Sequence, residues 1–159
     1  MLTPVLKSQF VTRIITNQSG VGRGYFTLAT LKKINQEFTR ILSSRGVRIE
    51  GIYFCPHLPD AGCPCRKPNP ALPKRAARDH NLDLKHSFMI GDQVRDMRLA
   101  QNIGARGVLV LTGSGTRARE QAVKICAKVT LNLSSAAKWI LSQSRNSSPQ
   151  SSSRNSLHG

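Results

Sequence analysis

Acidic residues are scarce in this sequence, with eight Asp and Glu against 24 Lys and Arg, which gives a net charge of +16. This imbalance favours an anionic partner, such as a phosphorylated metabolite, nucleic acid or a membrane surface, and does not choose among them. Aromatic residues are only 5% of the chain and do not interleave with the basic ones, as they do in proteins that stack single-stranded bases. Nucleic acid is therefore the less favoured partner, although the charge keeps it open.

Long hydrophobic runs are also missing. No run approaches the roughly 18 apolar residues of a membrane span, and the first ten residues lack the pattern of a secretion signal. We therefore expect a cytoplasmic protein that does not bind a membrane. Because cytoplasmic thiols stay reduced, clustered cysteines there are metal ligands more often than disulfides. Cys126 stands apart from the others and is expected to be a small buried residue.

The length of 159 residues suits a single domain and a monomer is expected. Residues 143–159 are rich in serine, hold no acid and have almost nothing apolar to bury. We therefore predict a folded domain over residues 1–142 and a disordered tail over residues 143–159.

Short apolar runs alternate with helical patterns along the domain, which is typical of parallel βαβ units in an α/β fold. The helix limits have supporting residues: Thr27 can cap one helix and Gly46 can end it, Pro70 suits a first turn, and Gly104 ends a third helix. The predicted strands are 11–16, 48–54, 87–90, 107–111 and 129–133, and the predicted helices are 27–44, 69–80, 93–103 and 134–141.

Polar segments follow three of the predicted strands, at residues 16–24, 65–68 and 91–96. In parallel α/β sheets the carboxyl ends of the strands share one edge, where ligands bind. We therefore expect the three segments to meet there.

Each segment has a functional and a plain structural interpretation. TNQSGVGRG (16–24) can cradle a phosphate with backbone N–H groups, or its three glycines, at 20, 22 and 24, can simply permit a positive φ in a connection. Arg66 and Lys67 can contact a phosphoryl group or be solvated surface charges. Asp92 and Asp96 lie about one helical turn apart and suit Mg²⁺, whereas Asp92 can also cap the helix that starts at Gln93.

A metal site is predicted by the segment CPHLPDAGCPC (55–65), which brings together Cys55, His57, Cys63 and Cys65. Three thiolates and one imidazole form the ligand set of a tetrahedral structural zinc site. The set leaves no open position for water, so we expect the zinc to stabilise the loop rather than to catalyse a reaction. Free buried thiols or a redox pair are the alternative.

The segments TNQSGVGRGYFT, GIYFCPHLPDAGCPCRKPNP and FMIGDQVRDM resemble the D-glycero-D-manno-heptose 1,7-bisphosphate phosphatases of the haloacid dehalogenase superfamily. The resemblance implies a Rossmann-like parallel sheet of the haloacid dehalogenase type with a zinc-binding loop. It also implies hydrolysis of a phosphorylated sugar through an aspartyl-phosphate. By resemblance, the catalytic residues are Thr16 and Lys67, the substrate-binding residues are Asn17, Gln18, Ser19, Arg66 and Gln93, the Mg²⁺ ligand is Asp92, and the Zn²⁺ ligands are Cys55, His57, Cys63 and Cys65.

The family's pair of aspartates, a nucleophile and a general acid and base two residues later, has no counterpart in this sequence. Residues 1–15 contain no Asp or Glu, and no two of the chain's aspartates are spaced two apart: Asp60, Asp79, Asp83, Asp92 and Asp96. We therefore expect an amino-terminally truncated chain that lacks the central first strand of the sheet and is inactive alone.

Three other functions fit the motifs less well. Relatives that hydrolyse histidinol phosphate share the metal loop, and polynucleotide 3′-phosphatases share a similar TNQ-glycine segment without that loop. The third is a non-enzymatic, basic, zinc-stabilised protein that binds nucleic acid or another protein, for which a salt-dependent binding assay is the test.

Overall fold

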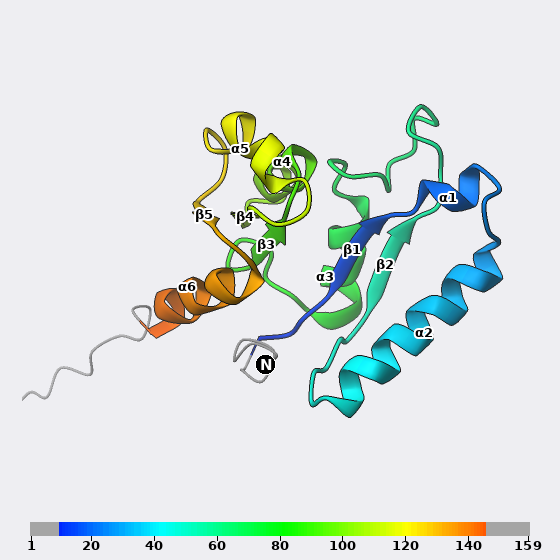
Figure 1. The fold of residues 1–159 in the computed structure, drawn as a ribbon, viewed down its shortest axis with the longest axis horizontal. Helices are drawn as coiled ribbons and strands as arrows, with labels where there is room; N and C mark the ends of the chain where they lie inside the picture. Colours follow the sequence, from blue (N-terminus) through cyan, green and yellow to red (C-terminus); the bar gives the residue numbers. More distant parts are fainter. Residues whose placement is uncertain (1–9, 146–159) are drawn as a thin grey trace, which may run out of the picture.

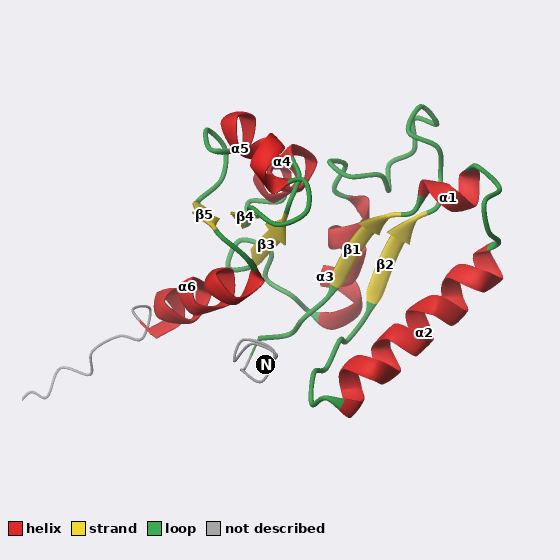
Figure 2. Cartoon of the chain, in the orientation of Figure 1, coloured by secondary structure: helices red, strands yellow, loops and turns green. Residues whose placement is uncertain are grey.

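The computed structural model describes residues 10–145. Its elements alternate along the chain, and every strand pair is parallel (Figures 1 and 2). The strands are β1 (Ile14–Asn17), β2 (Ile52–Cys55), β3 (Phe88–Gly91), β4 (Arg106–Val110) and β5 (Lys128–Thr130). The helices are α1 (Ser19–Gly22), α2 (Leu28–Ser44), α3 (Ala71–His80), α4 (Val94–Asn102), α5 (Gly115–Ala122) and α6 (Leu133–Arg145). The predicted α/β fold with parallel strands is confirmed.

The described strands form two sheets rather than one. β1 pairs with β2, placing Ile14 opposite Ile52, and the other sheet has the order β3-β4-β5. β1 and β3 are the edge strands that face each other across a groove of about 570 Å³. Its walls are mostly apolar and include Ile14, Ile15, Phe38, Leu42, Phe88, Met89 and Ile90. Among residues 10–145, no strand pairs with the groove-facing edge of β1 or of β3.

The core of the larger sheet is built on β4, whose side chains alternate between two faces. Leu109 points to one face and packs with Met97 of α4 and with Ala118 and Ala122 of α5. Val108 and Val110 point to the other face and pack against α6. A side chain as fully buried as Leu109 stabilises the fold by about 1.5–3 kcal/mol. Helices α4 and α5 on one face and α6 on the other therefore hold β3 and β4 in place. The polar edge of the sheet is fixed along with these strands.

Most helix limits follow the local signals in the sequence. The Oγ1 atom of Thr27 accepts a hydrogen bond from the Thr30 N–H at 3.1 Å, and Gly46 has a φ of 74°, so both predicted ends of α2 are confirmed. Gly104 also has a positive φ after α4. Pro70 was expected in the first turn of a helix, but it is the N-cap residue of α3, immediately before that helix begins.

The glycine-rich segment after β1 differs from the expectation at two of its three glycines. Gly24 has a positive φ, of 73°, whereas Gly20 and Gly22 lie in the short helix α1. A Cβ atom at position 22 would lie 2.8 Å from the carbonyl oxygen of Pro56. The glycine at position 22 therefore permits close packing of α1 on the cysteine loop rather than an unusual backbone angle.

The carboxyl-terminal helix α6 continues to Arg145, so it includes the first three residues of the predicted tail. Residues 146–159, the rest of that tail, lie outside the described residues, and the domain division stays a prediction. Among the described helices, none combines the length and the apolar character needed to cross a membrane.

Candidate functional site

The loop that follows β2 gathers four potential metal ligands. The Sγ atoms of Cys55, Cys63 and Cys65 and a ring nitrogen of His57 all lie within 4.8 Å of one another. Cys55 Sγ lies 3.4 Å from Cys63 Sγ, and His57 Nδ1 lies 3.2 Å from Cys65 Sγ. These separations are close to the edge of about 3.7 Å that a tetrahedron with Zn–S bonds of about 2.3 Å requires. The three cysteines are free thiols, so the group can hold a metal ion.

The thiols of this group strongly affect one another. Desolvation raises the pKa of Cys63, but hydrogen bonds from Cys55 and Cys65 outweigh it and bring that pKa down to about 7. Desolvation raises the pKa of Cys65 to about 12, and the neighbouring sulfurs add to the rise. Without a cation the cluster thus accommodates one thiolate readily and disfavours a second, as expected where negative sulfurs lie close together.

The cysteine loop is attached to β1 and α1 through backbone hydrogen bonds. The Gln18 N–H donates to the carbonyl of Cys55 at 2.7 Å, and the Gly22 N–H donates to the carbonyl of Pro56 at 2.9 Å. Arg66 donates from Nη1 to the carbonyl of His57 at 3.3 Å. In this structure Arg66 therefore binds its own loop.

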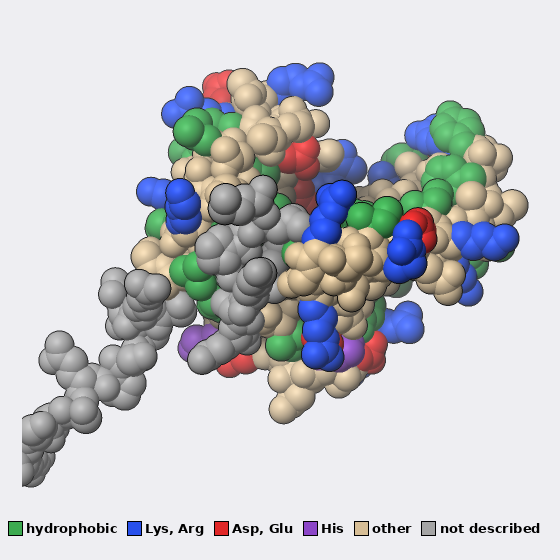
Figure 3. Space-filling view, turned by 60° about the horizontal axis from the view of Figure 1, so that its bottom comes forward, with side chains coloured by type: hydrophobic (Ala, Val, Ile, Leu, Met, Phe, Trp, Pro, Cys, Tyr) green, Lys and Arg blue, Asp and Glu red, His purple; other side chains and the backbone are tan. Residues whose placement is uncertain are grey.

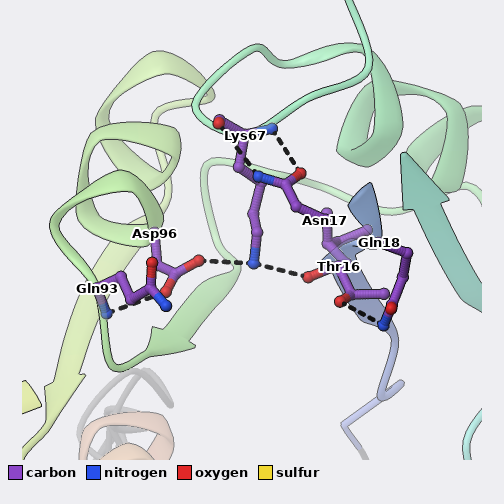
Figure 4. A network of polar contacts seen from close by, with 7 residues as sticks. Thr16, Asn17, Gln18, Lys67, Gln93 and Asp96 are labelled. Carbon is purple, nitrogen blue, oxygen red and sulfur yellow. Dashed lines mark hydrogen bonds and ion pairs between the residues drawn. The ribbon is translucent and has the colours of Figure 1, made fainter. Parts of the chain in front are cut away.

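Lys67 links strand β1 to helix α4. Its ammonium donates to the carbonyl of Ile15 in β1 at 2.9 Å and lies 2.7 Å from Oδ1 of Asp96 in α4 (Figure 4). The side chain of Lys67 is 14% exposed and that of Asp96 is 6% exposed. A solvated surface charge would not contact a buried carboxylate. The plain structural interpretation of Lys67 therefore does not explain this ion pair.

Asn17 fixes the backbone on which Lys67 is carried. Its Oδ1 accepts a hydrogen bond from the Lys67 N–H at 3.0 Å, and its Nδ2 donates to the Lys67 carbonyl at 3.4 Å. Gln18 Nε2 donates to Thr16 Oγ1 at 3.3 Å, which orients the hydroxyl group (Figure 4). The end of β1 and the Lys67 segment are therefore joined directly, as expected for carboxyl ends that share an edge.

The two aspartates after β3 have different surroundings. Asp96 is bound at both oxygens, since Oδ2 accepts from the Gln93 N–H at 3.1 Å while Oδ1 meets Lys67. Asp92 does not cap α4, because the N-cap residue is Gln93. Instead, Asp92 Oδ2 accepts from the Ser114 N–H at 2.8 Å. Asp92 thus keeps a second carboxylate oxygen with which it can hold a cation.

The structure brings together the predicted residues Thr16, Asn17, Gln18, Lys67 and Gln93, which belong to one polar network with Asp96 (Figure 4). Ser19 starts α1 at the margin of this network. Two features were missed from the sequence: the pairing of Asp96 with Lys67, and Ser114 as the residue that orients Asp92. The small residues around position 114, Gly113 and Gly115, were the available signal for a tight turn beside a polar group.

Comparisons with known proteins agree with this geometry. A family model described as "HAD-hyrolase-like" matches residues 64–135. The chain is 38% identical over 117 residues to the D-glycero-beta-D-manno-heptose-1,7-bisphosphate 7-phosphatase of Pseudomonas putida, covering 74% of this chain and 67% of that protein. It is 43% identical over 100 residues to the enzyme of the same name from Helicobacter pylori strain J99, covering 62% of this chain and 58% of that one.

Structural similarity extends over more of the chain. The D,D-heptose 1,7-bisphosphate phosphatase of B. bronchiseptica, crystallised with magnesium and phosphate, superposes with a TM-score of 0.81 at 34% identity, covering 89% of this chain and 79% of that one. The chain spans 58–67% of the length of the first curated relatives that it matches. Identity and coverage together show that this chain belongs to the D-glycero-beta-D-manno-heptose-1,7-bisphosphate 7-phosphatase family of HAD-like hydrolases.

Proposed function

We propose that this chain forms the phosphate-binding part of a phosphatase that hydrolyses a phosphomonoester of a sugar bisphosphate, of the D-glycero-D-manno-heptose 1,7-bisphosphate type. The observation that carries the proposal is the position of Lys67, whose ammonium lies between the end of β1 and α4 beside the Thr16 segment. A fixed ammonium in a partly dry site offsets the charge that develops on phosphoryl oxygens during transfer.

The other predicted residues have consistent roles in this proposal. Thr16 donates its hydroxyl to the transferring phosphoryl group, and Asn17 keeps the Lys67 backbone in place. Substrate is bound by Gln18, Ser19, Arg66 and Gln93. For Arg66 this requires that its guanidinium leave or share its contact with the His57 carbonyl.

Two metals fit the residues present. Asp92 retains a carboxylate oxygen for Mg²⁺, which binds through one or two carboxylates and substrate phosphate and would neutralise charge on the phosphoryl oxygens. The four ligands of the cysteine loop suit Zn²⁺ in a closed structural site. Zinc would fix the loop that carries Arg66 and Lys67.

In the chemistry of this family, the reaction begins with attack by a carboxylate nucleophile. Its oxygen attacks phosphorus, the bond between phosphorus and the sugar oxygen breaks, and that oxygen takes a proton from a general acid. Water then attacks the aspartyl-phosphate, gives its proton to the same group and releases inorganic phosphate. The first acidic residue of this chain is Glu37, which lies on α2 after the whole Thr16 segment. We therefore propose that the 159 residues bind the phosphate but need a carboxylate supplied in the groove between β1 and β3 for turnover.

Phosphate release from heptose 1,7-bisphosphate in the presence of Mg²⁺ tests this proposal. One preparation is the 159-residue chain, and a second carries an added apolar strand that ends in Asp-x-Asp-Gly before Met1. A matched control has Asn-x-Asn-Gly in the added strand. We expect turnover only with the aspartates. Turnover by the 159-residue chain at a normal enzymatic rate would refute the need for an added nucleophile.

A further inference from the structure

The turn that joins β4 to α5 has the sequence Thr-Gly-Ser-Gly-Thr (residues 112–116) and follows the carboxyl end of β4. We refer to it as the β4–α5 turn. It is closed by a hydrogen bond from the Gly115 N–H to the Thr112 carbonyl at 3.1 Å. The Thr116 hydroxyl donates to the Leu111 carbonyl, also at 3.1 Å. These two contacts give the turn a defined backbone conformation.

The β4–α5 turn encloses one carboxylate oxygen of Asp92. The Ser114 N–H donates to Oδ2 of Asp92 at 2.8 Å. Gly113, with a φ of 62°, lies against the same oxygen, because a Cβ atom at position 113 would be 2.5 Å from Oδ2 and 3.3 Å from Cγ of Asp92. Cβ atoms in proteins do not approach other heavy atoms as closely as 2.5 Å. The carboxylate therefore requires a glycine at position 113, in addition to the backbone angle that favours one.

Other glycines with a positive φ lack such a neighbour. Gly24 and Gly104 have φ angles of 73° and 71°. A Cβ atom at position 24 would meet nothing within 4 Å, and one at position 104 would make an ordinary contact with Lys85 at 3.5 Å. The backbone angle alone thus explains these two glycines. At Gly113 the packing against Asp92 is a separate requirement.

The hydrogen bond from Ser114 limits how Asp92 can bind a cation. Since Oδ2 is held by the turn, Oδ1 is the oxygen that remains for a metal. Asp96 adds no second carboxylate, because its two oxygens are bound to Lys67 and to the Gln93 N–H. Mg²⁺ takes an octahedral shell with one or two carboxylates, whereas Ca²⁺ takes about six to eight oxygens and can bind both oxygens of one carboxylate. A carboxylate restricted to one oxygen therefore favours Mg²⁺ relative to Ca²⁺.

The charge of the chain makes this local arrangement important for metal binding. With a net charge of +16, the chain repels a dication at long range. On the face seen in Figure 3, Lys and Arg side chains are scattered over several elements, and acidic side chains form small patches between them. The overall field therefore does not attract Mg²⁺, and its affinity depends on how accurately Asp92 presents its oxygen.

We propose that Gly113 and the Ser114 N–H are positioning groups of the metal site, which hold Asp92 as a one-oxygen ligand and thereby raise the preference for Mg²⁺ over Ca²⁺. The proposal rests on the proposed function, since it takes Asp92 to be the Mg²⁺ ligand. It assigns metal selectivity to a turn outside the segments whose motifs identified the family.

Titrations of the 159-residue chain with MgCl₂ and, separately, with CaCl₂ test the proposal, with backbone NMR signals around Asp92 as the readout. Phosphate is left out so that calcium does not precipitate. In Gly113→Ala the added methyl group displaces the Asp92 carboxylate from Ser114 and frees both of its oxygens. We expect the ratio of Mg²⁺ affinity to Ca²⁺ affinity to fall about tenfold, the effect of a lost charge-assisted hydrogen bond. Ser114→Pro removes the donor N–H and should lower the ratio in the same way.

Gly104→Ala is the matched control. It introduces an alanine at nearly the same positive φ, away from Asp92, so it carries a similar backbone cost. It should lower the stability in urea unfolding about as much as Gly113→Ala and leave the ratio of metal affinities unchanged. If Gly113 served only the backbone of its turn, the two alanine variants would behave alike in both measurements.

The unchanged chain provides a second test that needs no variant. Because Oδ2 of Asp92 stays with the turn, the through-hydrogen-bond coupling between the Ser114 amide nitrogen and the Asp92 carboxyl carbon should persist when Mg²⁺ saturates the site. Loss of this coupling on saturation would show that Asp92 leaves the turn to bind the metal, which contradicts the proposal.

The outcomes separate this proposal from the proposed function. If Asp92→Asn binds Mg²⁺ as the unchanged chain does, Asp92 is not the ligand, and the metal assignment of the proposed function fails. If Asp92→Asn weakens Mg²⁺ binding but folded Gly113→Ala and Ser114→Pro keep the ratio of affinities, the ligand is right and the positioning role is wrong. An equal fall of the ratio in Gly104→Ala would also overturn the positioning role.

Discussion

The ammonium of Lys67 lies 2.7 Å from Oδ1 of Asp96 and thereby joins the segment after the cysteine loop to helix α4. The same ammonium also donates to the carbonyl of Ile15, a residue that lines the groove between β1 and β3. It is the contact that brings residues from three separate segments of the chain into one site. Both charges are largely removed from water, so each depends on the other for compensation.

Lys67→Met should destabilise the fold by about 3–5 kcal/mol, because it leaves the buried carboxylate of Asp96 without its partner. The double variant Lys67→Met, Asp96→Asn should recover part of this loss. Urea unfolding measures both, with Arg40→Met as the control, since Arg40 pairs with Glu37 on the exposed face of α2 and should cost less than about 1 kcal/mol. Equal losses for Lys67→Met and Arg40→Met would show that the buried pair has no special role.

The cysteine loop should hold one zinc ion per chain. Cys63→Ser should remove most of the bound metal and lower the stability of the loop, because an incomplete ligand set binds zinc far more weakly. Metal analysis by mass spectrometry measures the content, and Cys126→Ser, which changes a cysteine outside the cluster, should leave it unchanged. A purified chain without stoichiometric metal would rule out the zinc site.

Alkylation should distinguish the thiols once the metal is removed. With its pKa of about 7, Cys63 is largely a thiolate at pH 7.5, whereas Cys65, with a pKa of about 12, stays protonated. Cys63 should therefore react first with iodoacetamide, and its rate should fall as the pH drops below 7 because the thiolate is the nucleophile. Mass spectrometry of peptides gives the site, and added zinc should protect it. Faster modification of Cys65 would contradict the described arrangement of the sulfurs.

The fold was predictable where a local signal and the overall pattern agreed. The apolar run before Gly91, the Thr27 cap and the cluster of Cys55, Cys63 and Cys65 each predicted their structure correctly. Helix α5 was not predicted, since its start contains Gly115 and its buried face presents only small residues such as Ala118. That helix forms because β4 and α4 offer it a surface, which the sequence of the segment does not encode.

The candidate site, like the fold, was predictable from the sequence only in part. The segments after β1 and β3 predicted which residues share an edge, because parallel strands bring their carboxyl ends together. The partner of Asp96 was not predictable, since spacing along a helix placed it with Asp92 as a metal ligand while the fold directs it to Lys67. Pairing across 29 positions depends on how the cysteine loop returns over β1, which is a property of the tertiary structure.

Asp92→Asn should weaken Mg²⁺ binding at least about tenfold while leaving the fold intact, because the amide oxygen can still accept from the Ser114 N–H but carries no charge. Calorimetric titration with Mg²⁺ in the presence of inorganic phosphate measures the change. Asp83→Asn is the matched control, since Asp83 is exposed and pairs with His86. Equal Mg²⁺ affinity in the Asp92 variant and the unchanged chain would show that Asp92 is not a ligand.

The most direct test of the account is the release of phosphate from heptose 1,7-bisphosphate by the chain that carries the added Asp-x-Asp-Gly strand, compared with the same protein bearing Lys67→Gln. With both proteins shown to be folded, we predict Mg²⁺-dependent release by the first and a loss of at least about hundredfold in the second, since an ammonium that stabilises developing phosphoryl charge contributes several kcal/mol. An equal rate for the two proteins, or no release from the first although it is folded and binds the bisphosphate, would contradict the central role assigned to Lys67 and this edge of the sheet.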